Sequence, residues 1–195
     1  NLFRRVAATP TETGGGVIKQ VVQVYKRDVT DLTGSGDQAI PGLEAQITPQ
    51  SSSSTILVVA HVSGSVNLNQ GGGLRMFRGS TPIGLAEPNG DIFRTSFSGN
   101  LFTGTGPGQE MGLFHASTEF IDSPNSGSAH TYKVVYATRD EGKAVSINSM
   151  SDTQDNESVP RGVSSLTLFE IGSLGGTTGV VLQLLQAYKT NKATI

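Results

Sequence analysis

Side chains able to perform metal or acid–base chemistry are few and scattered in this sequence. The three histidines, His61, His115 and His130, form no HxH or HExxH pair that would bring two imidazoles onto one metal ion. His61 and His115 fall within predicted strands, where a hydrogen-bonded or rim histidine is the ordinary role, and His130 opens a strand after a turn. The sequence therefore predicts no metal site and no cofactor.

The richest cluster of oxygen ligands is the segment SDTQDNES, which contains Asp152, Asp155, Asn156 and Glu157. Such oxygens could bind a hard cation, but the segment lacks the DxDxDG spacing and the glycine of an EF-hand. We interpret it as a solvated loop between two strands.

Nucleophilic and phosphate-binding motifs are also missing. The glycine-rich stretches 71–73 and 104–108 lack the lysine of a GxxxxGK[ST] loop, no GxSxG elbow occurs, and the chain has no cysteine. A carboxylate pair for glycoside hydrolysis would have to be brought within roughly 5 to 9.5 Å by the fold. The chain is shorter than a solenoid depolymerase and shows no repeating β-helix coil. We therefore predict that it is not an enzyme, with a carbohydrate-active domain as the less favoured alternative.

The composition excludes two classes of partner. Charged residues make up 15% of the 195 residues and the net charge is -2, with lysine and arginine scattered singly. A nucleic-acid binder needs a concentrated basic face, so nucleic acid is not an expected partner. No apolar run approaches the roughly 18 to 20 residues of a membrane span, so membrane insertion is not expected either.

Stretches rich in β-branched residues, separated by Gly, Pro, Asn, Asp and Ser, divide the chain into short predicted strands. Residues 17–26, VIKQVVQVYK, form the first of them. Residues 55–66 are apolar on both faces in their first half, which predicts a central strand. Further strands are predicted at residues 74–78, 81–86, 92–98, 110–121, 130–138, 143–148 and 163–171.

Two turns are predicted between these strands. Pro41 and Gly42 indicate one, followed by residues 43–47, which alternate between apolar and polar as a half-buried strand does. Residues 140–142, DEG, indicate a hairpin that joins the strands on either side. Many short strands at about ten-residue spacing, with almost no helix, predict an all-β antiparallel sandwich of jelly-roll type.

The two ends of the chain share a pattern that defines its domains. The sequence GVIKQVVQVYKRD at residues 16–28 aligns with GVVLQLLQAYKTN at residues 179–191. The identical pairs are Gly16 and Gly179, Val17 and Val180, Gln20 and Gln183, Gln23 and Gln186, Tyr25 and Tyr188, and Lys26 and Lys189. We predict an N-terminal arm or linker at residues 1–16, a β-sandwich module at residues 17–172, and a glycine linker with the first strand of a related module at residues 173–195. Either another copy of the domain follows, or the terminal strand pairs with its own or a neighbouring subunit's sheet.

Several segments, in order, resemble a module common in tail-fibre and other virion proteins of bacteriophages, especially those infecting cyanobacteria. They are VIKQVVQVYKRD, IPGLEAQITPQSSSSTILVVAHVSGSV, LRMFRGSTPIGLAEPNGD, FIDSPNSGSAHTYKVVYATR and RGVSSLTLFEI. The resemblance spans about residues 16–171. It implies a structural role in the virion, at the particle surface or tail, and commonly a homotrimer; it supplies no catalytic residues.

Two sets of residues are candidates for contacts. Leu101 and Phe102 stand among glycines in a predicted loop, where they could contact a subunit or host-surface glycan or receptor, or fold back over the core. Arg4 and Arg5 lie in an arm too polar to fold alone, which could dock on an acidic virion protein. The leading hypothesis is a trimeric tail-fibre or adhesin module that acts by host attachment. The alternative is a capsid decoration, head-fibre or neck protein.

Overall fold

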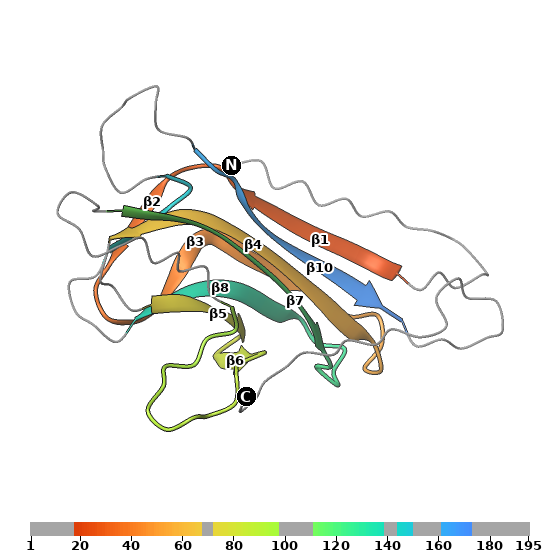
Figure 1. Ribbon diagram of the computed structural model, residues 1–195. Helices are drawn as coiled ribbons and strands as arrows, with labels where there is room; N and C mark the ends of the chain where they lie inside the picture. Colours follow the sequence, from red (N-terminus) through yellow and green to blue (C-terminus); the bar gives the residue numbers. More distant parts are fainter. Residues whose placement is uncertain (1–17, 68–71, 98–110, 139–143, 150–160, 173–195) are drawn as a thin grey trace, which may run out of the picture.

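The computed structural model describes residues 18–67, 72–97, 111–138, 144–149 and 161–172, and every regular element in these ranges is a β-strand (Figure 1). All strand pairs in this part of the chain are antiparallel, so the predicted all-β antiparallel class is confirmed. These ranges contain no helix long and apolar enough to cross a membrane.

The strands follow one another along nearly the whole described chain. They are β1 (Ile18–Lys26), β2 (Thr30–Thr33), β3 (Gly36–Ile47), β4 (Thr55–Asn67), β5 (Gly72–Arg78), β6 (Thr81–Ile83), β7 (Met111–Asp122), β8 (His130–Thr138), β9 (Ala144–Ile147) and β10 (Ser164–Ile171).

The strands form two sheets that share one hydrophobic core. The first sheet has the order β1-β10-β4-β9-β2, and β7 pairs with β4 on the side that β10 leaves open. The second sheet has the order β3-β8-β5-β6. β4 pairs with β10, β7 and β9, which confirms its predicted central position.

Eight of the strands pair in a nested order. β1 pairs with β10, β3 with β8, β4 with β7, and β5 with β6. The chain therefore runs as one long hairpin, in which each strand of the first half pairs with a strand of the second half. Successive pairs belong alternately to the first and the second sheet. As a result, the first and last described strands lie side by side (Figure 1).

Alternating burial in β3 and β4 supplies part of the core. In β3, Leu43, Ala45 and Ile47 are buried while Glu44 and Gln46 are exposed, which confirms the alternation predicted for residues 43–47. In β4, Ile56, Val58, Ala60 and Val62 point toward the same core. Because each apolar face is covered by the other sheet, the two layers stabilise each other.

The turn predicted at Pro41 and Gly42 is wrong, because both residues lie inside β3. The pairing of β3 with β8 shifts register between Ala39 and Glu44, and Gly42 has a φ of 85°. A bulge needs a residue that tolerates a left-handed backbone, and proline is tolerated there because no ladder hydrogen bond is lost. The Pro-Gly pair therefore marks an irregularity within one strand.

The hairpin predicted at residues 140–142 is also wrong. β8 pairs with β3 and β5 in the second sheet, whereas β9 pairs with β2 and β4 in the first. The two strands therefore cannot form a hairpin, although residues 140–142 themselves lie outside the described part of the chain. Turn residues indicate that the chain reverses, but they do not specify which sheet the next strand joins.

Several strand assignments also differ from the prediction, including the start of β3 at Gly36. Residues 92–97 form no strand and contribute only a bridge between Phe97 and Leu74. β6 ends at Ile83 because Gly84, with a φ of 61°, turns the backbone out of the strand. β2 was not predicted, since four residues carry too little alternation to stand out.

Candidate interaction surface

An apolar row crosses the outer face of the first sheet. Val21 of β1 lies opposite Phe169 of β10, Phe169 opposite Leu57 of β4, and Leu57 opposite Ile121 of β7. Val21 is 41% exposed and the other three side chains are half-buried. Nearby on β1, Ile18 is 57% exposed.

This row departs from the usual pattern of a solvated sheet face. An antiparallel sheet with one face on the core normally presents polar side chains on the other face. The residues next to the row in β10 and β4, Leu168 and Val58, are fully buried, so these strands are apolar on both faces here. Contiguous exposed apolar surface of this kind marks contact sites.

The surface becomes polar and aromatic toward the other end of β1. Tyr25 is 56% exposed, and the Arg27 guanidinium carbon lies 6.0 Å from the centre of its ring. Tyr25 is opposite Ser165, which is opposite His61. An exposed tyrosine beside an arginine offers apolar area, a hydroxyl and a charge to a partner, a combination enriched at interfaces.

Two of the three histidines meet on this same face. Their strands pair so that His61 lies opposite Ser117 and His115 opposite Ser63, and the two imidazole rings stack with their centroids 6.0 Å apart and their planes at 13°. His130 begins β8 in the second sheet. The described residues include no group of three or more His, Cys, Asp or Glu that could hold a metal ion.

A buried carboxylate fixes one end of β1 against the sheet. Glu170 is fully buried. Its Oε1 accepts hydrogen bonds from the Gln50 backbone N–H and the Ser54 hydroxyl, both at 2.7 Å, and its Oε2 accepts one from Gln20 Nε2 at 2.7 Å. Gln20 Nε2 also donates to the Thr48 carbonyl at 2.6 Å. This cluster ties β1 and β10 to the loop before β4.

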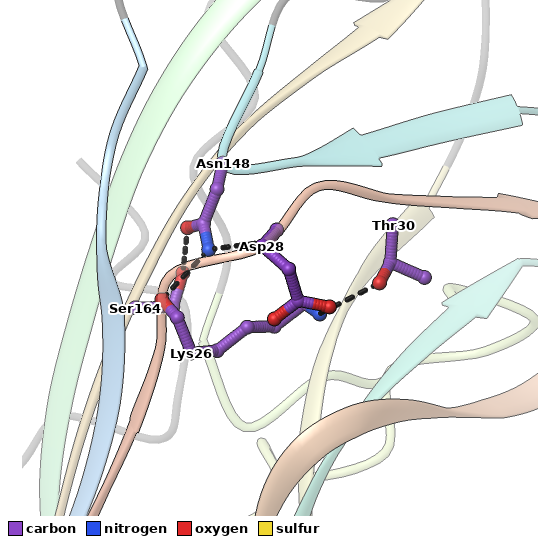
Figure 2. Close-up of polar contacts among 5 residues, drawn as sticks. All are labelled: Lys26, Asp28, Thr30, Asn148 and Ser164. Carbon is purple, nitrogen blue, oxygen red and sulfur yellow. Dashed lines mark hydrogen bonds and ion pairs between the residues drawn. The ribbon is translucent and has the colours of Figure 1, made fainter. Parts of the chain in front are cut away.

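A second polar cluster fixes the other end of β1 (Figure 2). The Lys26 side chain is fully buried, and its Nζ donates to Asp28 Oδ2 at 2.9 Å and to Thr30 Oγ1 at 2.6 Å. The hydrogen bond from Lys26 lowers the pKa of the exposed Asp28 carboxyl. Burial of an ammonium group is tolerated only with such partners, so this contact defines the turn from β1 into β2.

Asn148 stabilises the turn between β1 and β2 through hydrogen bonds to its backbone. Its Nδ2 donates to the Lys26 carbonyl at 2.8 Å and to the Asp28 carbonyl at 3.1 Å, and its Oδ1 accepts from the Ser164 hydroxyl at 2.6 Å (Figure 2). Asn148 is fully buried and has a φ of 65°, a conformation that asparagine adopts more readily than most residues.

A third polar cluster joins the two sheets. Asp122 of β7 accepts two hydrogen bonds from Arg78 Nη1 of β5, at 2.9 and 2.7 Å, and one from the Tyr132 hydroxyl of β8, at 2.6 Å. Burial, reinforced by the bond to Asp122, raises the pKa of Tyr132 above its ordinary range. This cluster connects strands of both layers and serves the fold.

The four predicted contact residues, Arg4, Arg5, Leu101 and Phe102, lie outside the described ranges. The predicted loop with Asp152, Asp155, Asn156 and Glu157 lies outside them as well. The residues of the surface itself were missed, because the apolar row joins four strands that are distant in sequence. The available signal was the repeat, whose identical positions include Gln20, Tyr25 and Lys26.

No family model and no curated protein matches this chain.

Proposed function

We propose that this chain is a structural module of a bacteriophage particle, of the tail-fibre or adhesin type, which acts by assembly into a homotrimer and by surface contact and not by catalysis. The observation that carries the proposal is the apolar row of Val21, Phe169, Leu57 and Ile121 on the outer face of the first sheet. A row of this kind is stable in water when a partner covers it.

The proposed occupant of the row is another copy of the same chain. The positions next to the row are Gln23 on β1, Thr167 on β10, Val59 on β4 and the exposed Glu119 on β7. A row of apolar side chains suits an identical apolar row better than it suits a charged partner.

We further propose that the two sheets form a jelly roll. Support comes from the nested pairing of β1 with β10, β3 with β8, β4 with β7, and β5 with β6. Four of these eight strands belong to the six-stranded first sheet and four make up the second sheet. Jelly rolls of eight strands occur in viral capsid and lectin domains. Because one fold hosts many functions, this order adds to the proposal without carrying it.

The oligomeric state of the purified chain tests the proposal. We expect light scattering to give the mass of a trimer, and Val21→Asp to give a monomer with an unchanged circular dichroism spectrum. The matched control is Gln46→Asp, which places the same charge at an exposed position of β3 in the second sheet, away from the candidate interaction surface. A monomeric wild-type chain, or an equally stable trimer of Val21→Asp, would contradict the proposal.

A further inference from the structure

The loop at residues 84–96, which follows β6, contains the sequence Asn89-Gly90 (Figure 1). No other asparagine among the 195 residues is followed by glycine. The side-chain amide of an asparagine is open to attack by the backbone nitrogen of the next residue, and glycine hinders this attack least because it has no Cβ. Both residues are exposed, so water reaches the site.

Asn89 begins a β-turn that leaves the Gly90 nitrogen accessible. The Ile92 N–H donates to the Asn89 carbonyl at 3.2 Å, and Gly90 has a φ of 55°. A positive φ at the second position of a turn is typical of the primed turn types and favours glycine. A Cβ built on Gly90 would meet no atom within 4 Å outside its chain neighbours, so the space beside this residue is open.

The turn belongs to a loop whose two sides are joined. Arg94 Nε donates to the Ala86 carbonyl at 2.5 Å, and the Ala86 N–H donates to the Thr95 carbonyl at 3.2 Å. These hydrogen bonds hold the chain on either side of the turn. The surroundings of Asn89 are therefore set by the folded loop as well as by its sequence.

Two other asparagines lie in surroundings that hinder the same reaction. Asn148 is fully buried, and its side chain donates to two backbone carbonyls and accepts from the Ser164 hydroxyl. Asn125 is exposed, but its Nδ2 donates to the Ser123 carbonyl at 3.1 Å and the next residue is serine. Among the described residues, none forms a hydrogen bond with the Asn89 side chain. Asn89 is thus the most reactive of the three.

We propose that Asn89 deamidates spontaneously in the folded protein, through attack by the Gly90 nitrogen. This nitrogen bonds to the Asn89 Cγ, the Cγ–Nδ2 bond breaks, and the Gly90 N–H proton leaves with the side-chain nitrogen as ammonia. The product is a five-membered succinimide. Water then opens the ring at either carbonyl, which gives aspartate or isoaspartate at residue 89. The reaction needs water alone and does not depend on the proposed function.

Isoaspartate at residue 89 would change the loop. The main chain then passes through the side-chain carbons, which adds a methylene between the α-carbon of residue 89 and Gly90. The former Asn89 carbonyl, which accepts from the Ile92 N–H, becomes a free carboxylate next to the exposed Glu87 and Asp91. The turn that presents Ile92, 64% exposed, is therefore lost in this product.

Peptide mass spectrometry tests the inference directly. Trypsin cuts after Arg78 and Arg94, so residues 79–94 are released as one peptide, in which Asn89 is the only asparagine and no glutamine occurs. The full chain is incubated in the folded state at mildly alkaline pH and body temperature before digestion. The expected result is growth of two products of this peptide, aspartate and isoaspartate forms, each heavier by about 1 Da.

Two variants and one control separate the cause. Asn89→Gln should slow the mass gain in this peptide at least several-fold, because the longer side chain would have to close a six-membered ring. Gly90→Ala should also slow it several-fold, because the added methyl group hinders the nitrogen. Asn125→Gln is the matched control and should leave the rate unchanged.

Three outcomes would overturn the inference. The first is an unchanged mass of peptide 79–94 after incubation of the folded chain, whether or not the chain unfolded in urea gains the mass. The second is a rate in Gly90→Ala equal to that of the wild type. The third is deamidation of Asn148 in the folded chain as fast as that of Asn89, since exposure and free side-chain atoms would then have no effect.

Discussion

Replacement of Asn148 by alanine should weaken the fold strongly, because its side chain serves three buried partners. The substitution leaves the carbonyl oxygens of Lys26 and Asp28 without their amide donor and the Ser164 hydroxyl without its acceptor. Each buried group that loses its partner costs about 1 to 3 kcal/mol, less where water can enter. Alanine at a φ of 65° adds roughly 1 kcal/mol of backbone strain.

The total for Asn148→Ala is therefore a decrease of about 3 to 5 kcal/mol in the free energy of unfolding. This is a large part of the roughly 5 to 15 kcal/mol that stabilises an ordinary domain. For a chain of this length it corresponds to a fall of roughly 10 °C in the melting temperature. Urea unfolding followed by far-ultraviolet circular dichroism measures it directly, which suits a chain without tryptophan.

Asn125→Ala is the matched control. Asn125 also has a positive φ, 52°, but it is exposed, and among the described residues its side chain donates one hydrogen bond, from Nδ2 to the Ser123 carbonyl at 3.1 Å. Its replacement should lower the free energy of unfolding by only about 1 kcal/mol, the strain of alanine in the left-handed region. If Asn125→Ala and Asn148→Ala lowered the free energy of unfolding equally, backbone strain alone would account for both losses. The role assigned to the buried hydrogen bonds of Asn148 would then be wrong.

Three further substitutions test the other polar clusters. Glu170→Ala leaves three donors without their acceptor and should lower the free energy of unfolding by about 3 to 5 kcal/mol in urea titrations, and a loss below about 1 kcal/mol would contradict the cluster. The hydrogen bond from Lys26 lowers the pKa of Asp28 from 3.8, so the carboxylate stabilises the fold above about pH 4 and loses this effect as the pH falls through the lowered pKa. The free energy of unfolding of Asp28→Asn should thus fall less than that of the wild type between about pH 5 and pH 2. An equal fall in the two proteins would refute this. Burial and the hydrogen bond to Asp122 raise the pKa of Tyr132, so above about pH 10 the tyrosine ionises in the unfolded chain first and the free energy of unfolding falls. Tyr132→Phe should reduce this loss of stability at alkaline pH in the same titration. An equally steep loss in the variant would count against the assigned role of Tyr132.

The sequence was sufficient for some of the local features of the fold. Alternation in residues 43–47 and the apolar run at 55–66 depend only on which side chains face the core, and both predictions agree with the structure. Pairing between distant strands was not accessible in this way. β8 and β9 are neighbours in the chain but belong to different sheets, which no turn residue between them could reveal.

The interaction surface was hidden for the same reason. His61 and His115 approach each other because β4 and β7 pair in one particular register, and a shift of one residue would send one ring to the core. Lys26 and Glu170 carry charges that normally indicate exposed positions, yet both are fully buried. Only the recurrence of Lys26 in the terminal repeat marked that position in advance.

Within the described part of the chain, the buried carboxylates Glu170 and Asp122 serve the fold. A catalytic acid must reach its substrate and exchange a proton with it. Glu170 is fully buried with both oxygens occupied by donors at 2.7 Å, and Asp122 is held by Arg78 and Tyr132 between the sheets. Because their lone pairs bind internal donors, these acids position strands: Glu170 sets the register of β1 on β10, and Asp122 joins the two layers. On the outer face of β1, by contrast, Val21 and Tyr25 are exposed.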